Sequence, residues 1–296
     1  MKAQVSVAAN EAKRLIAKGV ASMPAVQTAL MDGKILIKCG TTASAVAEEL
    51  AGMPLCISGR ITLMGTKTAH SKDQGMLRML LDKGQIKSGD DNQEEIGMQM
   101  GRGDVAIIGA NALDVQRKAA IMVAAPLGGS AGKLFPGLKA NGVTVIIAVG
   151  WEKLIPCSIE EAVSAAGRDS VDMATGSAVG LIPLSGTVVT ETDAVEMLAG
   201  VKATVIGAGG VLGAEGSTTL VIEGEPAKVK KAWQLVQSVK GATLSGVAES
   251  LVECNAKSPG CSKYLDAGGV TVLFHRACVY RQPDLPDHVF GKKGSR

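Results

Sequence analysis

Aromatic side chains are scarce in this sequence. Of its 296 residues only 2% are aromatic, comprising two Trp, two Tyr and three Phe. Proteins that bind single-stranded nucleic acids stack bases on aromatic rings, so this composition argues against that class. The net charge is +3, with the positive residues scattered, and the basic stretch at 292–296 is interpreted as a solvated tail. We therefore expect no nucleic-acid partner.

Long apolar runs are missing as well. The longest, such as residues 143–150, are too short to cross a bilayer. The opening stretch MKAQVSVAANEAKRLIAKGV contains Asn and Glu, and its pattern predicts an amphipathic helix rather than a signal peptide. Six Cys in a chain without an export signal favour reduced thiols. We expect a cytoplasmic protein with no membrane partner.

What the chain has is aliphatic residues and glycine. Hydrophobic residues make up 46% of it and there are 37 Gly, which is typical of an α/β protein with tight turns. Apolar runs at 35–39, 104–109 and 143–149 predict buried strands. The helices expected between and beside them lie at 10–18, 25–31, 45–50, 74–82, 115–123 and 134–140, and short strands are expected at 55–58 and 61–64.

This alternation predicts parallel strands joined by right-handed crossovers, in a Rossmann-like sheet with helices on both faces. Ligands of such sheets bind at the carboxyl ends of the strands. Segments 39–44, 109–114 and 150–153 follow three of the expected strands, so we expect them to share one edge.

The pattern changes after residue 180. Strands are expected at 181–190, 201–206 and 217–223, with helices at 193–198 and 226–239. This order suits a small ferredoxin-like α+β layer. The predicted organisation is a Rossmann-like α/β domain at 1–180, a ferredoxin-like domain at 181–245, and a segment at 246–296 that packs back on the α/β domain.

The turn after the first strand is a candidate anion site. Gly40 is followed by Thr41, Thr42 and Ser44 at the start of a helical pattern. Amides at a helix N-terminus favour an anion, and glycine permits close approach. An ordinary helix cap is the alternative, because Ser and Thr are common there. Cys39, just before the turn, is interpreted as a small core residue rather than a reactive thiol.

A second glycine-rich turn occurs at 126–140. Gly128 and Gly129 precede Ser130, and Lys133 follows at a helix start. Consecutive amides around glycines can form a concave anion site, to which Lys133 would add charge. A flexible turn between two elements is the alternative.

Few candidates for acid–base chemistry lie at the expected strand ends. Gly109 and Asn111 follow the second strand and are candidate ligand-binding residues, Asp114 lies close behind, and Glu152 follows the third. A proton-transfer reaction needs such a carboxylate, so Asp114 and Glu152 are the candidate catalytic residues. The alternative for Asn111 and Asp114 is a turn in which the side chains bond their own backbone.

The C-terminal cysteines raise the question of a metal. Cys254, Cys261, His275 and Cys278 could form a tetrahedral zinc site, but the first pair lacks the usual short spacing. Buried structural thiols are the preferred interpretation. We therefore expect no metal and no cofactor.

The motifs ILIKCGTTASAVAEEL, DVAIIGANALD, PLGGSAGKL and VTVIIAVGWEKLIP, with the later IPLSGTVV and GSTTLVIEGE, together resemble one superfamily. It includes type A ribose-5-phosphate isomerase, glucosamine-6-phosphate deaminase, CoA transferases and effector domains of sugar-responsive repressors. The resemblance covers most of residues 10–245 and implies an anionic ligand and assembly as a homodimer or larger. The isomerase's acids are replaced here by Ile108, Asn111 and Pro136, and its lysine by Leu127.

Two functions follow from these observations. The first is binding of a small anionic metabolite, such as a sugar phosphate, a nucleotide or a CoA-like compound, without catalysis. The second is an enzyme of the same fold, an isomerase, hydrolase or CoA/acyl transferase, with relocated catalytic residues. Asp114 or Glu152 would then be the base and Lys133 the anion clamp. A scaffold subunit with ordinary turns ranks below both.

Overall fold

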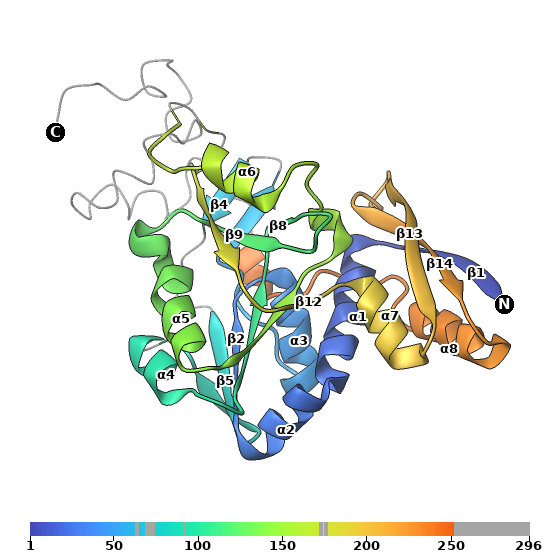
Figure 1. Cartoon of the computed structure of the whole chain (residues 1–296), viewed down its shortest axis with the longest axis horizontal. Helices are drawn as coiled ribbons and strands as arrows, with labels where there is room; N and C mark the ends of the chain where they lie inside the picture. The colour runs from blue at the N-terminus through green and yellow to red at the C-terminus, as the bar shows by residue number, and fades with distance from the viewer. Residues whose placement is uncertain (63–64, 69–74, 91–92, 172–173, 175–176, 252–296) are drawn as a thin grey trace.

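The computed structural model describes residues 1–62, 65–68, 75–90, 93–171, 174 and 177–251. In this part of the chain the fold is mixed α/β, with eight α-helices and a six-stranded mixed sheet accompanied by three smaller sheets (Figure 1).

The helices are α1 (Ala9–Ser22), α2 (Pro24–Asp32), α3 (Thr41–Ala51), α4 (Gln93–Gln99), α5 (Gly129–Ala140), α6 (Ile159–Ala165), α7 (Glu191–Ala199) and α8 (Pro226–Gln237). Three 3-10 turns are η1 (Pro126–Gly128), η2 (Trp151–Lys153) and η3 (Ala248–Leu251). The strands are β1 (Lys2–Val7), β2 (Lys34–Lys38), β3 (Gly59–Thr62), β4 (Gly65–Thr68), β5 (Arg78–Asp82), β6 (Gln85–Ser88), β7 (Val105–Gly109), β8 (Ala112–Leu113), β9 (Ala119–Val123), β10 (Thr144–Ala148), β11 (Gly180–Leu184), β12 (Thr187–Val189), β13 (Lys202–Gly209) and β14 (Ser217–Glu223).

The six-stranded sheet has the order β12-β10-β7-β2-β5-β6. Strands β12, β10, β7 and β2 run parallel, while β5 and β6 are antiparallel additions at one side. The central strands are nearly continuous apolar sequences, and such strands are stable when both faces of the sheet are covered. Expected strands at 35–39, 104–109 and 143–149 thus correspond to β2, β7 and β10.

Helices cover both faces of this sheet. Ile35 and Ile37 of β2 pack in a core with α1, α2 and α3. Leu36, between them, belongs to a second core with α4 and α5 on the opposite face. The alternation of side chains along a strand explains this division. It also directs Lys38, the last residue of β2, toward the α5 face, where it lines a small cavity.

A three-stranded antiparallel sheet of order β1-β14-β13 forms the right-hand part of the molecule in Figure 1. Its buried side chains alternate with more exposed ones, as in Thr218, Leu220 and Ile222 of β14. Helices α7 and α8 complete its core. Helix α1 contributes to two cores, because Leu15 packs with the small sheet and Ile16 with the large one.

Helix α1 also packs closely against α7. A Cβ atom on Gly19 would lie 2.6 Å from the Cβ of Ala194, which is closer than two carbon atoms can approach. Glycine at this position therefore sets the spacing between the two helices, and so the position of the α7 N-terminus relative to α1.

Several elements differ from the sequence-based expectation. The opening residues form strand β1 before the helix begins at Ala9. The helix expected at 115–123 is instead the hairpin of β8 and β9, and the helix expected at 74–82 is replaced by β5. The expected strand at 181–190 is two strands in different sheets, β11 and β12, and no regular element forms at 55–58.

These differences bear on the expected domain division. Strand β1 pairs along its whole length with β14, although residues 1–180 were assigned to one domain and 181–245 to another. Strand β12 lies after residue 180 but belongs to the large sheet. Near the end of the described chain, the amide of Val247 donates to the carbonyl of Leu55, 3.0 Å away, so this segment packs against the α/β part.

Candidate functional site

The carboxyl ends of the four parallel strands define one edge of the large sheet. Strand β2 leads into Gly40, β7 ends at Gly109, β10 is followed by Gly150, and β12 is followed by Thr190. The three segments expected to share an edge therefore all begin there. This is the place where open α/β sheets bind ligands.

Helix α3 begins directly at this edge. Gly40 is its N-cap residue with φ 150°, a backbone conformation that side chains other than glycine's rarely adopt. The amide of Ser44 donates to the carbonyl of Gly40 at 2.7 Å. The amides of Thr41 and Thr42 precede the first possible helical bond, so they remain available to an anion.

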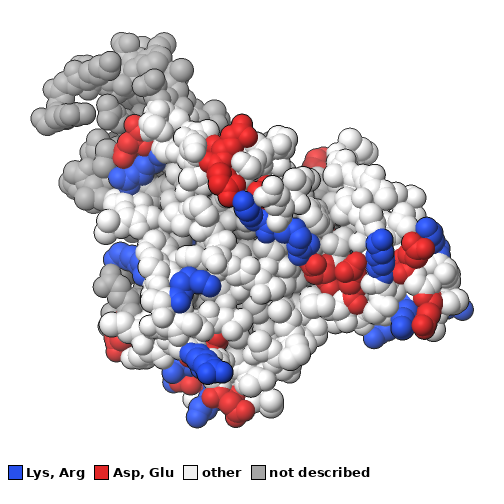
Figure 2. All heavy atoms as spheres, in the orientation of Figure 1, with Lys and Arg blue, Asp and Glu red and all other residues white. Residues whose placement is uncertain are grey.

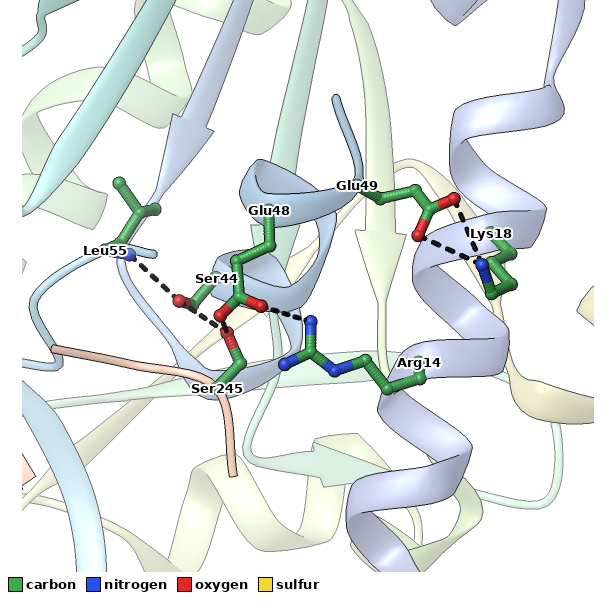
Figure 3. Close-up of polar contacts among 7 residues, drawn as sticks. All are labelled: Arg14, Lys18, Ser44, Glu48, Glu49, Leu55 and Ser245. Carbon is green, nitrogen blue, oxygen red and sulfur yellow. Dashed lines mark hydrogen bonds and ion pairs between the residues drawn. The ribbon is translucent and has the colours of Figure 1, made fainter. Parts of the chain in front are cut away.

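Ser44 does not face a ligand at this edge. Its hydroxyl is buried and accepts a hydrogen bond from the amide of Leu55 at 2.9 Å. Ser245 donates to it at 2.7 Å and also lies 2.6 Å from Glu48, which accepts a bond from Arg14 (Figure 3). Ser44 therefore joins α3 to two other segments of the chain. Its hydroxyl makes structural contacts in this arrangement, while the expected contact with a ligand stays a prediction.

Two ion pairs join α3 to α1. Glu48 and Glu49 of α3 pair with Arg14 and Lys18 of α1, at 2.5 and 3.3 Å (Figure 3). These contacts fix how α1 and α3 pack together.

Asn111 and Asp114 form the turn that was given as the alternative to a catalytic role. The Oδ1 atom of Asn111 accepts a bond from the amide of Met122 at 3.0 Å. Asp114 is buried and accepts bonds from the amides of Gln116, Lys118 and Ile159, at 2.9, 2.9 and 3.1 Å. Burial raises the pKa of Asp114, but these three donors outweigh burial and hold its pKa below the ordinary value.

The glycine-rich turn lies at the start of α5. Gly128 and Gly129 have φ values of 71° and 55°, and their amides donate to the carbonyls of Ala125 and Pro126. Those two amides are therefore used within the turn. Ser130 is half-buried and Lys133 exposed at the first turn of the helix. This end of the helix remains a candidate site for an anion through its first free amides.

Two buried cations lie side by side near this helix. Lys38 and Arg78 are paired across β2 and β5, so their side chains point to the same face, and only 7% and 6% of their surfaces are exposed. Arg78 forms an ion pair of 3.1 Å with Asp90. The Lys38 ammonium has no hydrogen bond or ion pair to any residue that the structure describes. Lys38 lines a cavity of about 10 Å³, together with residues of β7 and α5.

A second group of buried charges lies at the ends of β10 and β12. Glu152 follows β10, Glu191 is the first residue of α7, and Lys13 comes from α1. The side chain of Glu152 is only 8% exposed, and its two buried oxygens accept no hydrogen bond from the residues described. The nearest charge is the Lys13 ammonium, 3.9 Å from Oε1.

Glu191 is held more firmly than Glu152. Its Oε1 accepts a bond from the hydroxyl of Thr218 at 3.0 Å, and its Oε2 accepts one from the amide of Trp151 at 3.1 Å. A Cβ on Gly150 would lie within 3.4 Å of carboxylate oxygens of both Glu152 and Glu191, so the two carboxylates face a common point. We call Lys13, Glu152 and Glu191 the acid–lysine cluster.

The pKa values of Glu191 and Lys13 in this cluster are both shifted. Burial raises the pKa of Glu191 to about 7, and the negative charge of Glu152 adds to the rise. Burial lowers the pKa of Lys13, and the attraction of Glu152 only partly opposes this. Shifts of this kind at a strand end are typical of functional sites, although structural ion pairs also produce them.

The tip of the β13–β14 hairpin contacts this cluster at Gly216. A Cβ on Gly216 would lie 3.3 Å from the Cβ of Glu152, and the tip also contains Gly209, Gly210 and Gly213, all with positive φ. Leu212 at the tip is 98% exposed. The tip thus combines permissive backbone with an apolar side chain in solvent.

Sequence reasoning included Glu152 but missed Lys38, Arg78, Lys13 and Glu191. The sequence contained one signal for Lys38. It is the last residue of a strand that is apolar on both faces, so its side chain would be expected to lie on a covered face. Lys13 in α1 and Glu191 in the first turn of α7 gave no such signal, since Lys and Glu side chains of helices are normally exposed. Cys39 lies 3.1 Å from the Ser58 hydroxyl, and the candidate zinc residues Cys254, Cys261, His275 and Cys278 lie outside the described residues.

Comparison with known proteins finds no match to a family model, to a curated protein or to a solved structure.

Within the described ranges, no group of three or more His, Cys, Asp or Glu residues is arranged to hold a metal ion. No helix among these residues is long and apolar enough to span a bilayer. On the face shown in Figure 2, Lys and Arg are interspersed with Asp and Glu.

Proposed function

We propose that this protein binds a small anionic metabolite, such as a sugar phosphate, a nucleotide or a CoA-like compound, at the carboxyl edge of the large sheet. The observation that carries the proposal is Lys38. Its side chain is largely buried at the end of β2, next to buried Arg78, and its ammonium has no hydrogen bond or ion pair to the residues described. A bound anion would supply the missing partner for this charge.

The surroundings of Lys38 support an anion on chemical grounds. Gly40, two residues later, begins α3, whose first amides point toward the same edge. The N-terminus of α5 at Gly129–Ala140 packs on the face to which Lys38 points, since Ala131 and Lys38 line the same cavity. The ligand-binding residues in this proposal are therefore Lys38 and Arg78 with the amides near Thr41 and Ser130.

The proposal is tested by thermal unfolding of the purified protein with inorganic phosphate, sugar phosphates, nucleotides and CoA. An anion at a hundredfold excess over its Kd should add about 2.7 kcal/mol of stability. Lys38→Met should abolish the stabilisation. Lys34→Met, at the other end of the same strand, is the matched control and should leave it intact. Stabilisation that survives Lys38→Met, or none by any anion, would refute the proposal.

An enzymatic function is the second candidate, and Glu152 favours it. A buried carboxylate without hydrogen bonds at a strand end is suited to accept a proton from a substrate. Asp114 is a poorer base because three amides already occupy its oxygens. Assays with aldose phosphates and acyl-CoA compounds would test this candidate. An activity that is retained in Glu152→Gln would exclude Glu152 as the base.

We further propose that the large sheet is Rossmann-like and that the small sheet is a ferredoxin-like layer with one strand fewer. The order β1, α1, β13, β14, α8 supports the second point, because it matches the first five elements of the β-α-β-β-α-β order of a ferredoxin-like layer. Membership of the isomerase and CoA-transferase superfamily, a cytoplasmic location and assembly as a homodimer or larger remain parts of this proposal. Light scattering on the purified protein would test the assembly.

A further inference from the structure

With both carboxylates ionised, the acid–lysine cluster carries more negative than positive charge. Two carboxylates face one lysine, and that lysine is 3.9 Å from Glu152 without a hydrogen bond to it. The Lys13 ammonium instead lies 3.4 Å from Oδ1 of Asn10. Ionised carboxylates only accept hydrogen bonds, so the two oxygens of Glu152 need donors from elsewhere.

We propose that the acid–lysine cluster is a binding site for the protonated amino group of a small organic molecule. This inference goes beyond the proposed anion site and does not depend on Lys38. An ammonium group offers three donors, which can reach both oxygens of Glu152 and one oxygen of Glu191. Its charge would make the cluster neutral, with two carboxylates facing Lys13 and the ligand.

A metal ion fits this cluster less well than an ammonium group. A divalent cation needs several oxygen ligands, whereas the cluster supplies two carboxylates beside a lysine. The described residues offer no third acidic or imidazole ligand here. A neutral donor would satisfy the oxygens of Glu152 but would leave the excess charge in place.

Without a ligand, a proton on Glu191 reduces the negative charge of the cluster. Glu191 faces Glu152 of η2, the hydroxyl of Thr218 of β14 and the amide of Trp151, and Lys13 of α1 lies on the far side of Glu152 as its ion-pair partner. Lys153 also acts on Lys13. When the ammonium binds, Glu191 loses its proton to solvent, and the proton lost equals the positive charge gained.

The hairpin tip at 207–216 lies beside the acid–lysine cluster. This segment lies against Glu152 at Gly216 and carries four glycines with positive φ. Its exposed Leu212 makes no contribution to a core in this arrangement. We infer that the tip opens to admit the ligand and then closes over it.

Methylammonium chloride is the probe for this site, with tetramethylammonium chloride, magnesium chloride and sodium chloride at equal ionic strength as controls. A ligand of two non-hydrogen atoms should bind with a Kd on the order of 10 mM. Methylammonium should raise the unfolding temperature more than the other three salts do. Below pH 7, calorimetry in buffers of different ionisation enthalpy should show proton release of up to one per ligand.

Variants connect the binding to the cluster. Glu152→Gln should reduce the affinity for methylammonium at least tenfold, and Glu191→Gln should abolish proton release and weaken binding. Glu160→Gln, which alters an exposed ion-paired carboxylate, should change neither. If Glu152→Gln does not fold, Glu191→Gln carries the test. Equal effects of methylammonium and tetramethylammonium, binding that survives both variants, or preference for Mg²⁺ would overturn the proposal, while the Lys38 experiment would be unaffected.

Discussion

The hydroxyl of Thr218 donates a hydrogen bond to Glu191, 3.0 Å away, and thereby connects the small sheet to the carboxyl edge of the large one. Thr218 belongs to β14, and Glu191 begins α7 directly after β12. The same carboxyl group receives the amide of Trp151 at the end of β10. A residue whose protonation changes near neutral pH thus stands at the junction of both sheets.

The first prediction concerns the pH dependence of stability. Because the pKa of Glu191 is about 7 in the folded protein and 4.5 in its ordinary state, the folded protein holds a proton that the unfolded chain releases. The contribution of Glu191 to the free energy of unfolding is complete below pH 4.5 and is lost as the pH rises through 7. The loss should reach up to about 3 kcal/mol.

Urea unfolding between pH 4.5 and 8 would measure this decline, and Glu191→Gln should remove it. Glu160→Gln should leave the decline as it is. Carboxylates with lowered pKa, such as Asp114 and Glu11, act in the opposite direction and at lower pH, where stability is lost as they become protonated. A flat profile in the unmodified protein above pH 4.5 would contradict the prediction.

The second prediction concerns Ser44 and Ser245. Ser44→Ala leaves the buried amide of Leu55 without an acceptor, so it should reduce the free energy of unfolding by about 1–3 kcal/mol. Ser245→Ala should cost less, since Glu48 keeps its bond to Arg14. The double variant should lose less than the sum of the two, because the hydroxyls contact each other. Additive losses in chemical denaturation would show that the two hydroxyls act independently.

The third prediction distinguishes a structural Asp114 from a catalytic one. In Asp114→Asn the amide nitrogen replaces one acceptor, and the buried amide of Ile159 then faces a donor. Stability should fall by about 1–3 kcal/mol. Any activity or ligand affinity of the folded variant should stay near that of the unmodified protein. A variant of normal stability that has lost activity would restore Asp114 as a catalytic residue.

The fourth prediction concerns Lys38 in the absence of ligand. Lys38 is largely buried and its charge has no partner, so replacing it by an apolar side chain of similar size should stabilise the protein, and Lys38→Met should gain about 1–3 kcal/mol. Lys34→Met should change stability by less than about 0.5 kcal/mol. The anion affinity should be lost at the same time. Destabilisation by Lys38→Met would mean that its charge contributes to the fold itself.

The sequence predicted the central strands of the large sheet well and the strands β5 and β9 less well. The runs at β2, β7 and β10 are apolar on both faces, and such runs are typical of parallel strands that are covered on both faces. Residues 119–123 read AAIMV and 78–82 read RMLLD, and both are rich in good helix formers. They became strands because tight turns at Arg117 and Lys83, both with positive φ, return the chain at once to an antiparallel neighbour.

The candidate site was predictable in its position but only partly in its residues. Parallel strands place their ends at one edge, so Gly40, Gly109 and Glu152 follow from the order of elements. Lys13 and Glu191 depend on how α1 and α7 pack around the small sheet. That packing rests on β1, whose partner β14 lies far along the chain, and no local pattern specifies such a pairing.

Strand β1 also determines when the protein can be completed. During synthesis β1 emerges well before its partner β14, which follows only after every strand of the large sheet. The small sheet, and with it the contact of Thr218 with Glu191, must therefore form late, after a slow closure of distant segments. Until then α1 can pack on the large sheet through Ile16 while Leu15 stays uncovered. A partly synthesised chain would thus expose one apolar stripe of α1, where unwanted association can begin.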